Sequence, residues 1–326
     1  MDDGGKFDGR RTSFTNVCGV EPIVAWHFTD PGCPWAYSSR PAIARLRWRF
    51  GDQLDWRLVL IGLSETTERY ERIGYTPGRQ ASGHRRFQAR FGMPFGAGVK
   101  PRLAPTSRAC RAIIAARDVS PELGYAALRA LQLMQFTTAD LLDDDAALRR
   151  ALATVEGLDA DAVVARIDDA EVLAEYERDR ARARSAEGTP THVQGRHSDS
   201  DGPVRYTAPS VVFERADGRV LEVGGFQPFE AYDTALANLD RSLVRRPAPD
   251  DAAEVVLEYP FGLTTAEVAS IMRPSDLDDA DLVATERELI AAADEGRILC
   301  EPAGSDALWL PPAAAATGAG AAAAAA

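Results

Sequence analysis

The chain has 326 residues, of which 45% are hydrophobic, and it carries a formal net charge of −12. At roughly 150 residues per domain, this length predicts two compact units with their own cores, and the composition excludes a disordered chain. No apolar run approaches the roughly 18–20 residues of a transmembrane helix, and the polar N-terminus lacks the apolar stretch of a signal peptide, so we expect a soluble, cytoplasmic protein that contacts no membrane.

The first predicted element is a strand over the short apolar run from Ile23 to Phe28. A loop follows, in which Cys33 is succeeded by Pro34. Proline is tolerated in the first turn of a helix, so Cys33 is expected at or next to a helix N-terminus. Unpaired backbone amides and the positive end of the helix dipole stabilise a thiolate there. The sequence therefore predicts that Cys33 is an accessible nucleophile with a lowered pKa.

The helix predicted after Cys33 continues to about Phe50, and the alternating segment from Leu54 to Leu60 predicts a half-buried strand. The stretch from Gly74 to Pro105 is rich in Gly, Pro and Arg and is predicted to be a long functional or mobile loop. Helical spacing of apolar residues then predicts four helices, at Ser107 to Arg117, Pro121 to Phe136, Asp145 to Glu156 and Ala160 to Arg184.

A second β-rich stretch follows, in which Pro209 comes directly before the apolar run from Ser210 to Phe213. Asp217-Gly218 is a hairpin-turn dipeptide, and it leads into a second strand that ends at Val223. Glycines and a proline then introduce a helix that ends near Leu239.

The segment from Asp30 to Tyr37, D-P-G-C-P-W-A-Y, resembles the active-site loop of the DsbA-like (FrnE-like) branch of the thioredoxin superfamily. That loop contains the tetrapeptide C-P-W-C, and here Ala36 stands in place of the second cysteine. The resemblance implies a thioredoxin-like fold with a helical insertion. It also implies that Pro209 is a cis-proline facing Cys33, and that Pro41 is a kinking proline in the first helix.

The predicted C-terminal unit consists of three helices and a β-hairpin, which resembles a winged helix. From Asp251 to Gly296 it has twelve acids and two arginines, a local net charge of −10. Binding to phosphate backbones needs Lys and Arg, so no nucleic acid is expected as a partner. We expect a protein-contact or homodimerisation module whose removal leaves the chemistry of Cys33 intact.

The expected fold class is α/β, a thioredoxin-like fold with a helical insertion, followed by a small winged-helix-like C-terminal domain. The patterns divide the chain into a disordered N-terminus at 1–20, a thioredoxin-like domain at 21–61 and 189–245, a helical insertion at 62–188, a linker at 246–250, a winged-helix-like domain at 251–312 and a low-complexity tail at 313–326.

Ala36 decides the chemistry that the resemblance implies. In a two-cysteine site the second thiol resolves the mixed disulfide, and this motif has no such thiol. We therefore expect a thiol–disulfide oxidoreductase that acts as a monothiol through Cys33, on a thiol or disulfide substrate. A glutathione- or mycothiol-like low-molecular-weight thiol is its expected external partner, and no cofactor is expected to be bound tightly. Cys110 is the candidate for a distant resolving thiol.

Two alternatives remain open. The kappa-class glutathione transferases and the hydroxychromene carboxylate isomerases share this fold, and they hold a cofactor thiolate at the same helix terminus. They typically carry Ser at the position of Cys33, which argues against a transferase or isomerase. The second alternative is a redox-inactive binding protein, for which Ala36 is the main evidence.

Other residues near the predicted thiol, and two of the remaining cysteines, are interpreted one by one. His27, near the end of the first strand, is interpreted as a structural residue, with a thiolate partner as the alternative. Cys18 and Cys300 are expected to be inert. The predicted substrate-binding residues are Pro34, Trp35, Thr207, Ala208 and Pro209.

From Arg69 to Arg117 the chain has eleven Lys or Arg and one acid, a local net charge of +10. We interpret Arg85, Arg86 and Arg108 as candidates for binding the carboxylates or phosphates of a thiol cofactor. The alternative is that these arginines form a solvated face or pair with acids between Asp140 and Asp179. No metal site is expected, because no histidine lies at ligand spacing from a cysteine or an acid.

Overall fold

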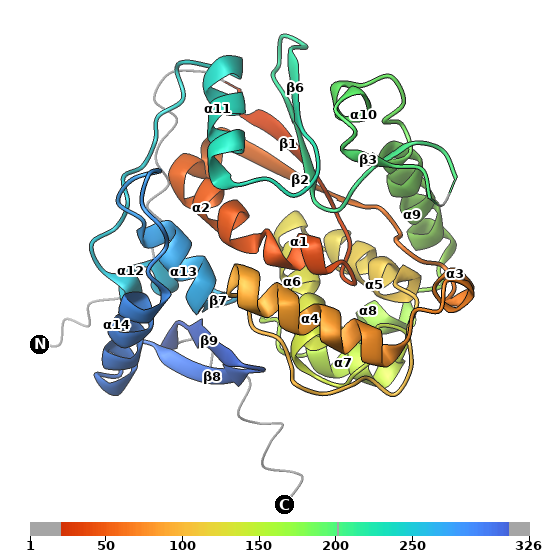
Figure 1. Cartoon of the computed structure of the whole chain (residues 1–326), viewed down its shortest axis with the longest axis horizontal. Helices are drawn as coiled ribbons and strands as arrows, with labels where there is room; N and C mark the ends of the chain where they lie inside the picture. Colours follow the sequence, from red (N-terminus) through yellow and green to blue (C-terminus); the bar gives the residue numbers. More distant parts are fainter. Residues whose placement is uncertain (1–20, 201, 313–326) are drawn as a thin grey trace, which may run out of the picture.

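The computed structural model describes residues 21–200 and 202–312. The predicted disordered N-terminus at 1–20, the low-complexity tail at 313–326 and Cys18 lie outside the described residues. Figure 1 shows a sheet with helices on both sides, and a small C-terminal unit, drawn in blue, against one end of this body.

The central sheet contains β1 (Ile23–Thr29), β2 (Leu54–Leu60), β5 (Ser210–Glu214) and β6 (Val220–Val223), in the order β2-β1-β5-β6. β2 pairs in parallel with β1, whereas β5 is antiparallel to both β1 and β6. A parallel pair with a helical crossover, followed by an antiparallel hairpin, is the strand arrangement of a thioredoxin-like fold. The predicted α/β fold class is confirmed.

The helix predicted after Cys33 is divided in two. α1 (Pro34–Ser38) ends before α2 (Arg40–Phe50), and Pro41 lies in the first turn of α2 rather than inside a continuous helix. A short 3-10 turn, Gly51–Gln53, connects α2 to β2.

One face of the sheet is covered by α2 and α11 (Phe229–Leu239). Leu46 from α2, Phe213 from β5 and Leu236 from α11 belong to one buried core. This core fixes the direction of α2, and therefore also of the short helix α1 that precedes it.

Between β2 and β5 lies the predicted helical insertion. Its helices among the described residues are α3 (Glu68–Arg72), α4 (Pro77–Phe91), α5 (Ser107–Arg117), α6 (Pro121–Thr137), α7 (Asp145–Leu152), α8 (Ala160–Ala165) and α9 (Ala170–Ala183). After residue 188, in the stretch assigned to the thioredoxin-like domain, come α10 (Pro190–Val193), β3 (His197–Ser198) and β4 (Arg205–Tyr206). The single helix predicted from Ala160 to Arg184 is interrupted, because Asp169 has an extended backbone (φ −64°, ψ 142°) and begins α9.

The stretch from Gly74 to Pro105, predicted as a loop, contains the fifteen-residue helix α4, so that prediction was wrong. Thr76 caps the helix by accepting a hydrogen bond from the Arg79 amide at 3.2 Å, and Pro77 lies in the first turn. Gly92 ends the helix in the left-handed conformation, with φ 73°. The Thr-Pro start and the Gly end are stronger local signals than the overall Gly and Arg content.

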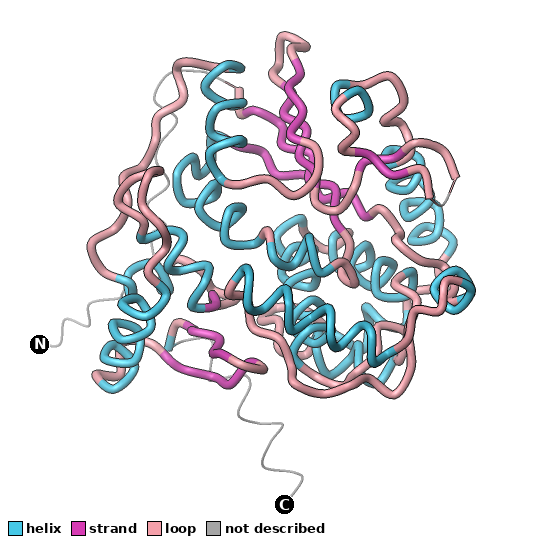
Figure 2. The backbone as a smooth tube through the Cα atoms, viewed as in Figure 1, coloured by secondary structure: helices cyan, strands magenta, loops and turns pink. Residues whose placement is uncertain are grey.

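The C-terminal unit contains α12 (Ala252–Leu257), β7 (Leu263–Thr264), α13 (Thr265–Met272), α14 (Leu282–Asp294), β8 (Leu299–Ala303) and β9 (Asp306–Leu310). Its strands form an antiparallel sheet, ordered β7-β9-β8, which Figure 2 shows apart from the central sheet. Ala44 and Trp48 of α2 share a buried core with Val268 and Trp309 of this unit. The unit is therefore packed directly against the helix that follows the cysteine loop.

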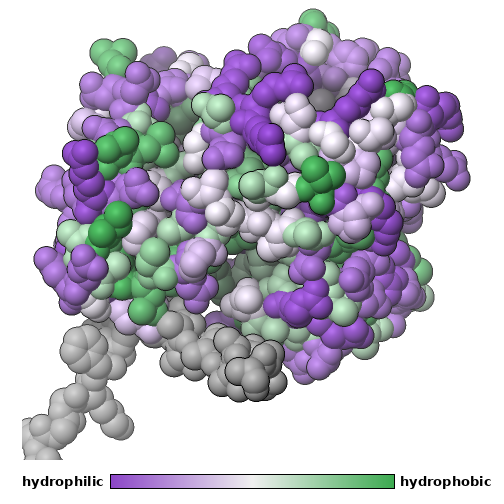
Figure 3. Space-filling model, turned by 60° about the horizontal axis from the view of Figure 1, so that its bottom comes forward, coloured by the Kyte–Doolittle hydropathy of each residue, from purple (hydrophilic) through white to green (hydrophobic). Residues whose placement is uncertain are grey.

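Figure 3 shows one face of the molecule, on which hydrophobic residues occur in small groups among hydrophilic ones. Exposed large hydrophobic side chains of the C-terminal unit include Leu277, Val283 and Ile290. None of the helices in the described part of the chain is long and apolar enough to cross a membrane.

Candidate active site

Cys33 lies at the start of α1, as the sequence predicts. It is the N-cap residue, with φ −88° and ψ 115°, and Pro34 occupies the first helical turn. The Cys33 amide donates to the Asp30 carbonyl at 3.3 Å, and the Cys33 carbonyl accepts from the Tyr37 amide at 3.0 Å. A turn on one side and a helix on the other therefore fix the backbone at the thiol.

The loop before β5 lies against this helix start. The Ala208–Pro209 peptide bond is cis. The Cys33 Sγ donates a hydrogen bond to the Ala208 carbonyl oxygen at 3.1 Å, across 175 positions of sequence. Thr207 donates from its hydroxyl to the Arg196 carbonyl at 3.2 Å. The fold thus brings together the two segments that the sequence analysis assigned to one site.

The ionisation of Cys33 differs from the prediction. The residue is only 6% exposed, and burial raises the pKa of its thiol to about 11. The amides of Ala36 and Trp35 lower this pKa, and the nearby Asp30 carboxyl raises it. Burial is the largest effect, so Cys33 is a protonated thiol at neutral pH in this conformation. The expectation of an accessible thiolate with a lowered pKa is wrong.

Asp30 is a site residue that the sequence analysis did not identify. Its fully buried carboxyl group accepts hydrogen bonds from the amides of Gly32 at 2.9 Å and Leu63 at 2.7 Å, and from the Thr106 hydroxyl at 3.1 Å. A Cβ on Gly32 would lie 2.4 Å from Thr106 Cγ2, so only glycine fits this turn. The sequence signal for this role was the tripeptide Asp-Pro-Gly, because the side chain of an Asp in a turn accepts a hydrogen bond from the backbone amide two residues later.

Cys110, the candidate resolving thiol, is bonded to the same carboxyl group. Its Sγ donates to Asp30 Oδ2 at 3.5 Å, and the residue is fully buried in the insertion core. Burial raises the pKa of the Cys110 thiol well above its usual value. A resolving role for Cys110 stays a prediction, and it requires this thiol to leave its present environment.

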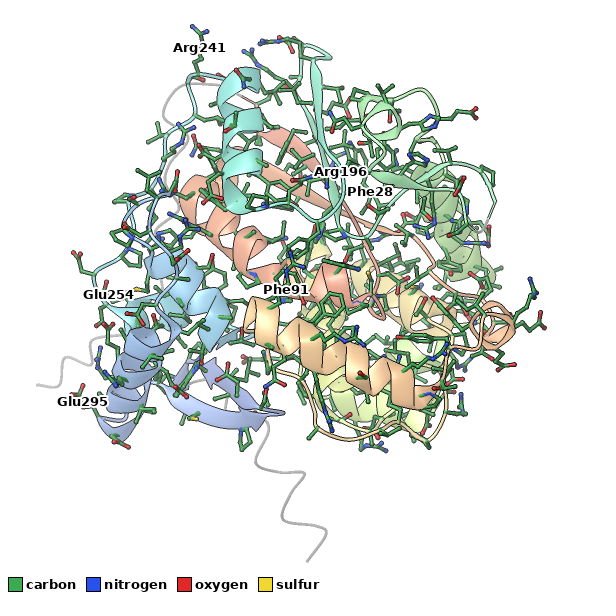
Figure 4. All side chains as sticks on the ribbon, viewed as in Figure 1. Phe28, Phe91, Arg196, Arg241, Glu254 and Glu295 are labelled. Carbon is green, nitrogen blue, oxygen red and sulfur yellow. The ribbon has the colours of Figure 1, made fainter. Side chains whose placement is uncertain are left out.

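Four aromatic side chains meet beside the cysteine loop. Trp35 is 43% exposed, and its ring lies edge-on to Phe87 of α4, with 4.7 Å between centroids, and to Phe226, with 5.3 Å. Phe91, labelled on α4 in Figure 4, lies 4.7 Å from Phe226. The sequence analysis identified only Trp35. The missed signals were the Phe87–Phe91 pair at helical spacing and the phenylalanine after Gly224-Gly225.

Arg108 was a candidate for anion binding, and the structure corrects this. Its guanidinium is bonded to both carboxylate oxygens of Asp145, and to Asp168 at 3.1 Å. These carboxylates raise the pKa of Arg108 above its usual value. Arg108 therefore pairs with acids of the insertion, which was the alternative interpretation of these arginines.

Arg85 and Arg86 are exposed on α4, and neither pairs with an acid among the described residues. Arg85 donates to the Ala97 carbonyl at 3.4 Å, and Arg86 donates to the Ser82 hydroxyl at 3.4 Å. Both guanidinium groups therefore lie at the surface without a carboxylate partner within the described part of the chain.

His27 packs among aromatic rings rather than at the thiol. It is stacked on Tyr125, with ring centroids 6.1 Å apart, and edge-on to Trp56 at 6.0 Å. Burial lowers the pKa of His27 to about 3, so it is neutral at physiological pH. Cys300 is exposed on β8. Within residues 21–200 and 202–312, no group of three His, Cys, Asp or Glu side chains could hold a metal ion.

No protein-family model matches the chain. Among curated proteins, it is similar to the ClpXP adapter protein SpxH of Shouchella clausii (strain KSM-K16). The two are 24% identical over 272 residues, which cover 78% of this chain and 83% of that protein.

Two solved structures of oxidoreductases also align with the chain. The cytosolic disulfide reductase DsbM from Pseudomonas aeruginosa is 21% identical, with a TM-score of 0.47, and the alignment covers 67% of this chain and 100% of that one. A probable DsbA oxidoreductase from Streptomyces coelicolor is 21% identical, with a TM-score of 0.48, and the alignment covers 66% of this chain and 89% of that one.

Proposed function

We propose that this protein is a thiol–disulfide oxidoreductase that works with one thiol, Cys33, and an external low-molecular-weight thiol. The observation that carries the proposal is the 3.1 Å hydrogen bond from Cys33 Sγ to the Ala208 carbonyl. It joins a cysteine at a helix N-terminus to the loop that contains a cis peptide bond before Pro209. A substrate chain that paired with Thr207 and Ala208 would bring its own sulfur next to Cys33.

The reaction has two exchange steps. In the first, Cys33 attacks one sulfur of a disulfide, a new bond forms between Cys33 and that sulfur, and the other sulfur leaves with the proton of the Cys33 thiol. In the second, a glutathione- or mycothiol-like thiol attacks the substrate sulfur of the mixed disulfide, and Cys33 leaves as a thiol. Ala36 supplies no second sulfur, so an external thiol has to perform the second step.

Substrate binding has to assist the first step. Burial holds the pKa of Cys33 near 11, and the amides of Ala36 and Trp35 are the groups that oppose this effect. Displacing the Ala208 carbonyl from the sulfur with a substrate chain would free Cys33 to be deprotonated as it attacks. The expected catalysis is therefore slow with small disulfides that do not engage the loop at Thr207.

The remaining parts of the proposal concern partners. Arg86 of α4 is the candidate for the carboxylates of the external thiol, which is not bound tightly as a cofactor. The protein acts in the cytoplasm. The C-terminal unit is a winged-helix-like module for protein contacts, including a homodimer, and its acidic charge opposes binding to nucleic acid.

The test is reduction of a mixed disulfide between a peptide and glutathione, with glutathione as the reductant. We expect turnover that depends on added thiol in the wild type, loss of turnover in Cys33→Ser, and wild-type rates in Cys110→Ser. Intact mass of Cys33-containing protein, taken without reductant, should show a thiol adduct. Turnover that survives Cys33→Ser would refute the proposal.

A second candidate is a binding protein without thiol chemistry, comparable to an adapter. The observations in its favour are the 6% exposure of Cys33 and the alanine at position 36. The curated relative is described as an adapter protein of ClpXP. Under this proposal the wild type and Cys33→Ser would show the same absence of turnover, and both would still bind a protein partner.

A further inference from the structure

The four aromatic side chains beside Cys33 form a partly exposed surface, here called the aromatic patch. Its members are Trp35, Phe87, Phe91 and Phe226. They come from α1, from α4 and from the loop between β6 and α11. Three segments distant in sequence thus contribute rings to one surface, which borders the loop that holds the thiol.

An arginine of α4 flanks one side of the aromatic patch. The Arg90 guanidinium lies 5.2 Å from the centroid of the Phe91 ring. At 3.6 residues per turn, Arg90 lies about 60° around α4 from Phe87 and about 100° from Phe91. Arg86 lies about 100° and 140° from these two rings, and Arg85 about 160° and 120°. Arg90 is therefore the arginine of α4 that borders the patch, and the hydrogen bond of Arg85 to Ala97 lies on the other side of the helix.

Another arginine flanks the opposite segment. Arg196 packs against the backbone at Gly225, directly before Phe226, where its Cδ would lie 3.6 Å from an added Cβ. Its carbonyl accepts the hydrogen bond from Thr207. In Figure 4 Arg196 lies near the base of the β5–β6 hairpin. Neither Arg90 nor Arg196 is bonded to an acid among the described residues, and α4 contains no acid.

A groove lies along the edge strand β6 of the sheet, next to the segment that carries Phe226. It encloses about 540 Å³ and is lined by Arg196, by Gly224 and Gln227 on either side of Phe226, and by residues of β6 and α11. The carboxylate of Glu222 in its wall is bonded to the Tyr206 hydroxyl at 2.8 Å and the Thr191 amide at 2.9 Å. The groove therefore presents polar groups and the Arg196 guanidinium, which is bonded to no acid among the described residues, next to the segment that carries Phe226.

We propose that the aromatic patch and this groove bind an extended acidic segment of a protein substrate. An apolar side chain of the segment packs on Trp35 and Phe91, and carboxylates on either side bind Arg90 and Arg196. The charges select acids, because these arginines have no carboxylate partner among the described residues. The rings select a chain with an apolar residue, which a small anionic thiol lacks. This inference rests on the proposed function, since it names the substrate of the same site.

The experiment uses the full chain with Cys33→Ser, so that binding is measured without exchange. The probes are a labelled extended peptide with one Phe between pairs of Asp and Glu, and a matched peptide in which each acid is Lys. We expect the acidic peptide to bind at least about tenfold more tightly, and its affinity to fall as salt screens the charges. Reversing both charges, Arg90→Glu with Arg196→Glu, should remove about tenfold in affinity.

The matched control is Arg85→Glu, an equal charge change on the far side of α4. Its affinity for the acidic peptide should stay within about twofold of the parent value. Equal affinity for the two peptides, or equal losses in the control and in the double variant, would overturn the inference. A second result would also overturn the inference. In it the acidic peptide does not bind, and sedimentation shows that the parent protein self-associates whereas the double variant is monomeric. A second copy of the chain would then occupy the patch.

Turnover by the wild type of the mixed disulfide between a peptide and glutathione, with glutathione as the reductant, separates this inference from the proposed function. Turnover without peptide binding refutes the acidic-segment inference alone. Peptide binding that follows the expected pattern, without turnover in the wild type, supports the surface and refutes the oxidoreductase proposal.

Discussion

The Glu267 carboxylate accepts two hydrogen bonds from the Arg129 guanidinium, at 2.7 and 2.8 Å, so the C-terminal unit is ionically bonded to helix α6. Arg40, at the start of α2, donates a further bond to Glu267 at 2.9 Å. Glu267 is fully buried. Burial alone would raise the pKa of Glu267, but Arg129 and Arg40 outweigh it and lower the pKa to about 2.

Replacing Glu267 should destabilise the whole protein. Glu267→Ala leaves two guanidinium groups without their carboxylate, and we expect the free energy of unfolding in urea to fall by about 3–5 kcal/mol. Glu286→Gln, on the exposed face of α14, is the matched control and should change it by less than about 0.5 kcal/mol. Equal effects of the two substitutions would show that the bonds of Glu267 to Arg129 and Arg40 do not contribute to the free energy of unfolding.

The same carboxylate predicts a dependence of stability on pH. Its folded-state pKa of about 2 lies below the ordinary value of 4.5, so the ionised group stabilises the folded state above about pH 4.5. This stabilisation is lost as the pH falls from about 4.5 toward 2. We expect the difference in unfolding free energy between wild type and Glu267→Gln to shrink over that window, as measured by urea titrations. A constant difference would contradict the prediction.

The alkylation rate of Cys33 should rise steeply with pH. Because its pKa is about 11, the thiolate fraction, and with it the rate, should grow about tenfold per pH unit between pH 7 and 10. Peptide-mapped pulse alkylation in a Cys300→Ser background measures this without competition from the exposed thiol on β8. A rate that levels off below pH 8 would mean that the helix N-terminus, rather than burial, has the larger effect on the pKa of the Cys33 thiol.

Ala36→Cys should restore a two-thiol site. Ala36 lies one helical turn after Cys33 and is buried, so the introduced sulfur should face the existing one. Under mild oxidation we expect a disulfide between Cys33 and the introduced thiol, detected by intact mass and loss of alkylation, and protein disulfide reductase activity. Ala44→Cys, in the core shared with the C-terminal unit, is a control that should form no such bond. A folded variant that stays reduced would show that the two positions are not within bonding reach.

Removing the C-terminal unit should destabilise the rest of the chain, whereas the expectation from sequence concerned only the chemistry of Cys33. A chain that ends at Pro249 exposes Ala44 and Trp48 and leaves Arg40 without Glu267. We expect a lower thermal midpoint and increased binding of a hydrophobic dye, relative to full-length protein. A truncated chain with an unchanged midpoint would show that the two units are energetically independent.

The elements with local signals were predictable from the sequence. Pro34 placed Cys33 at a helix start, and the bounds of α5 follow from its apolar spacing. The pKa of Cys33 was not predictable, because its sign depends on how much of the side chain neighbouring segments cover. The aromatic patch was missed for the same reason: Phe91 and Phe226 are 135 positions apart, and no local pattern links them.

The packing of α2 also sets an order of events during synthesis. Trp48 shares a buried core with Val268 and Trp309. These two residues leave the ribosome more than 200 residues after Trp48. At about 5–20 residues per second, α2 waits roughly 13–52 s until both partners are synthesised. Until then the face of α2 that carries Ala44 and Trp48 is open to solvent and to chaperones, so translation of the acidic unit is needed to bury it.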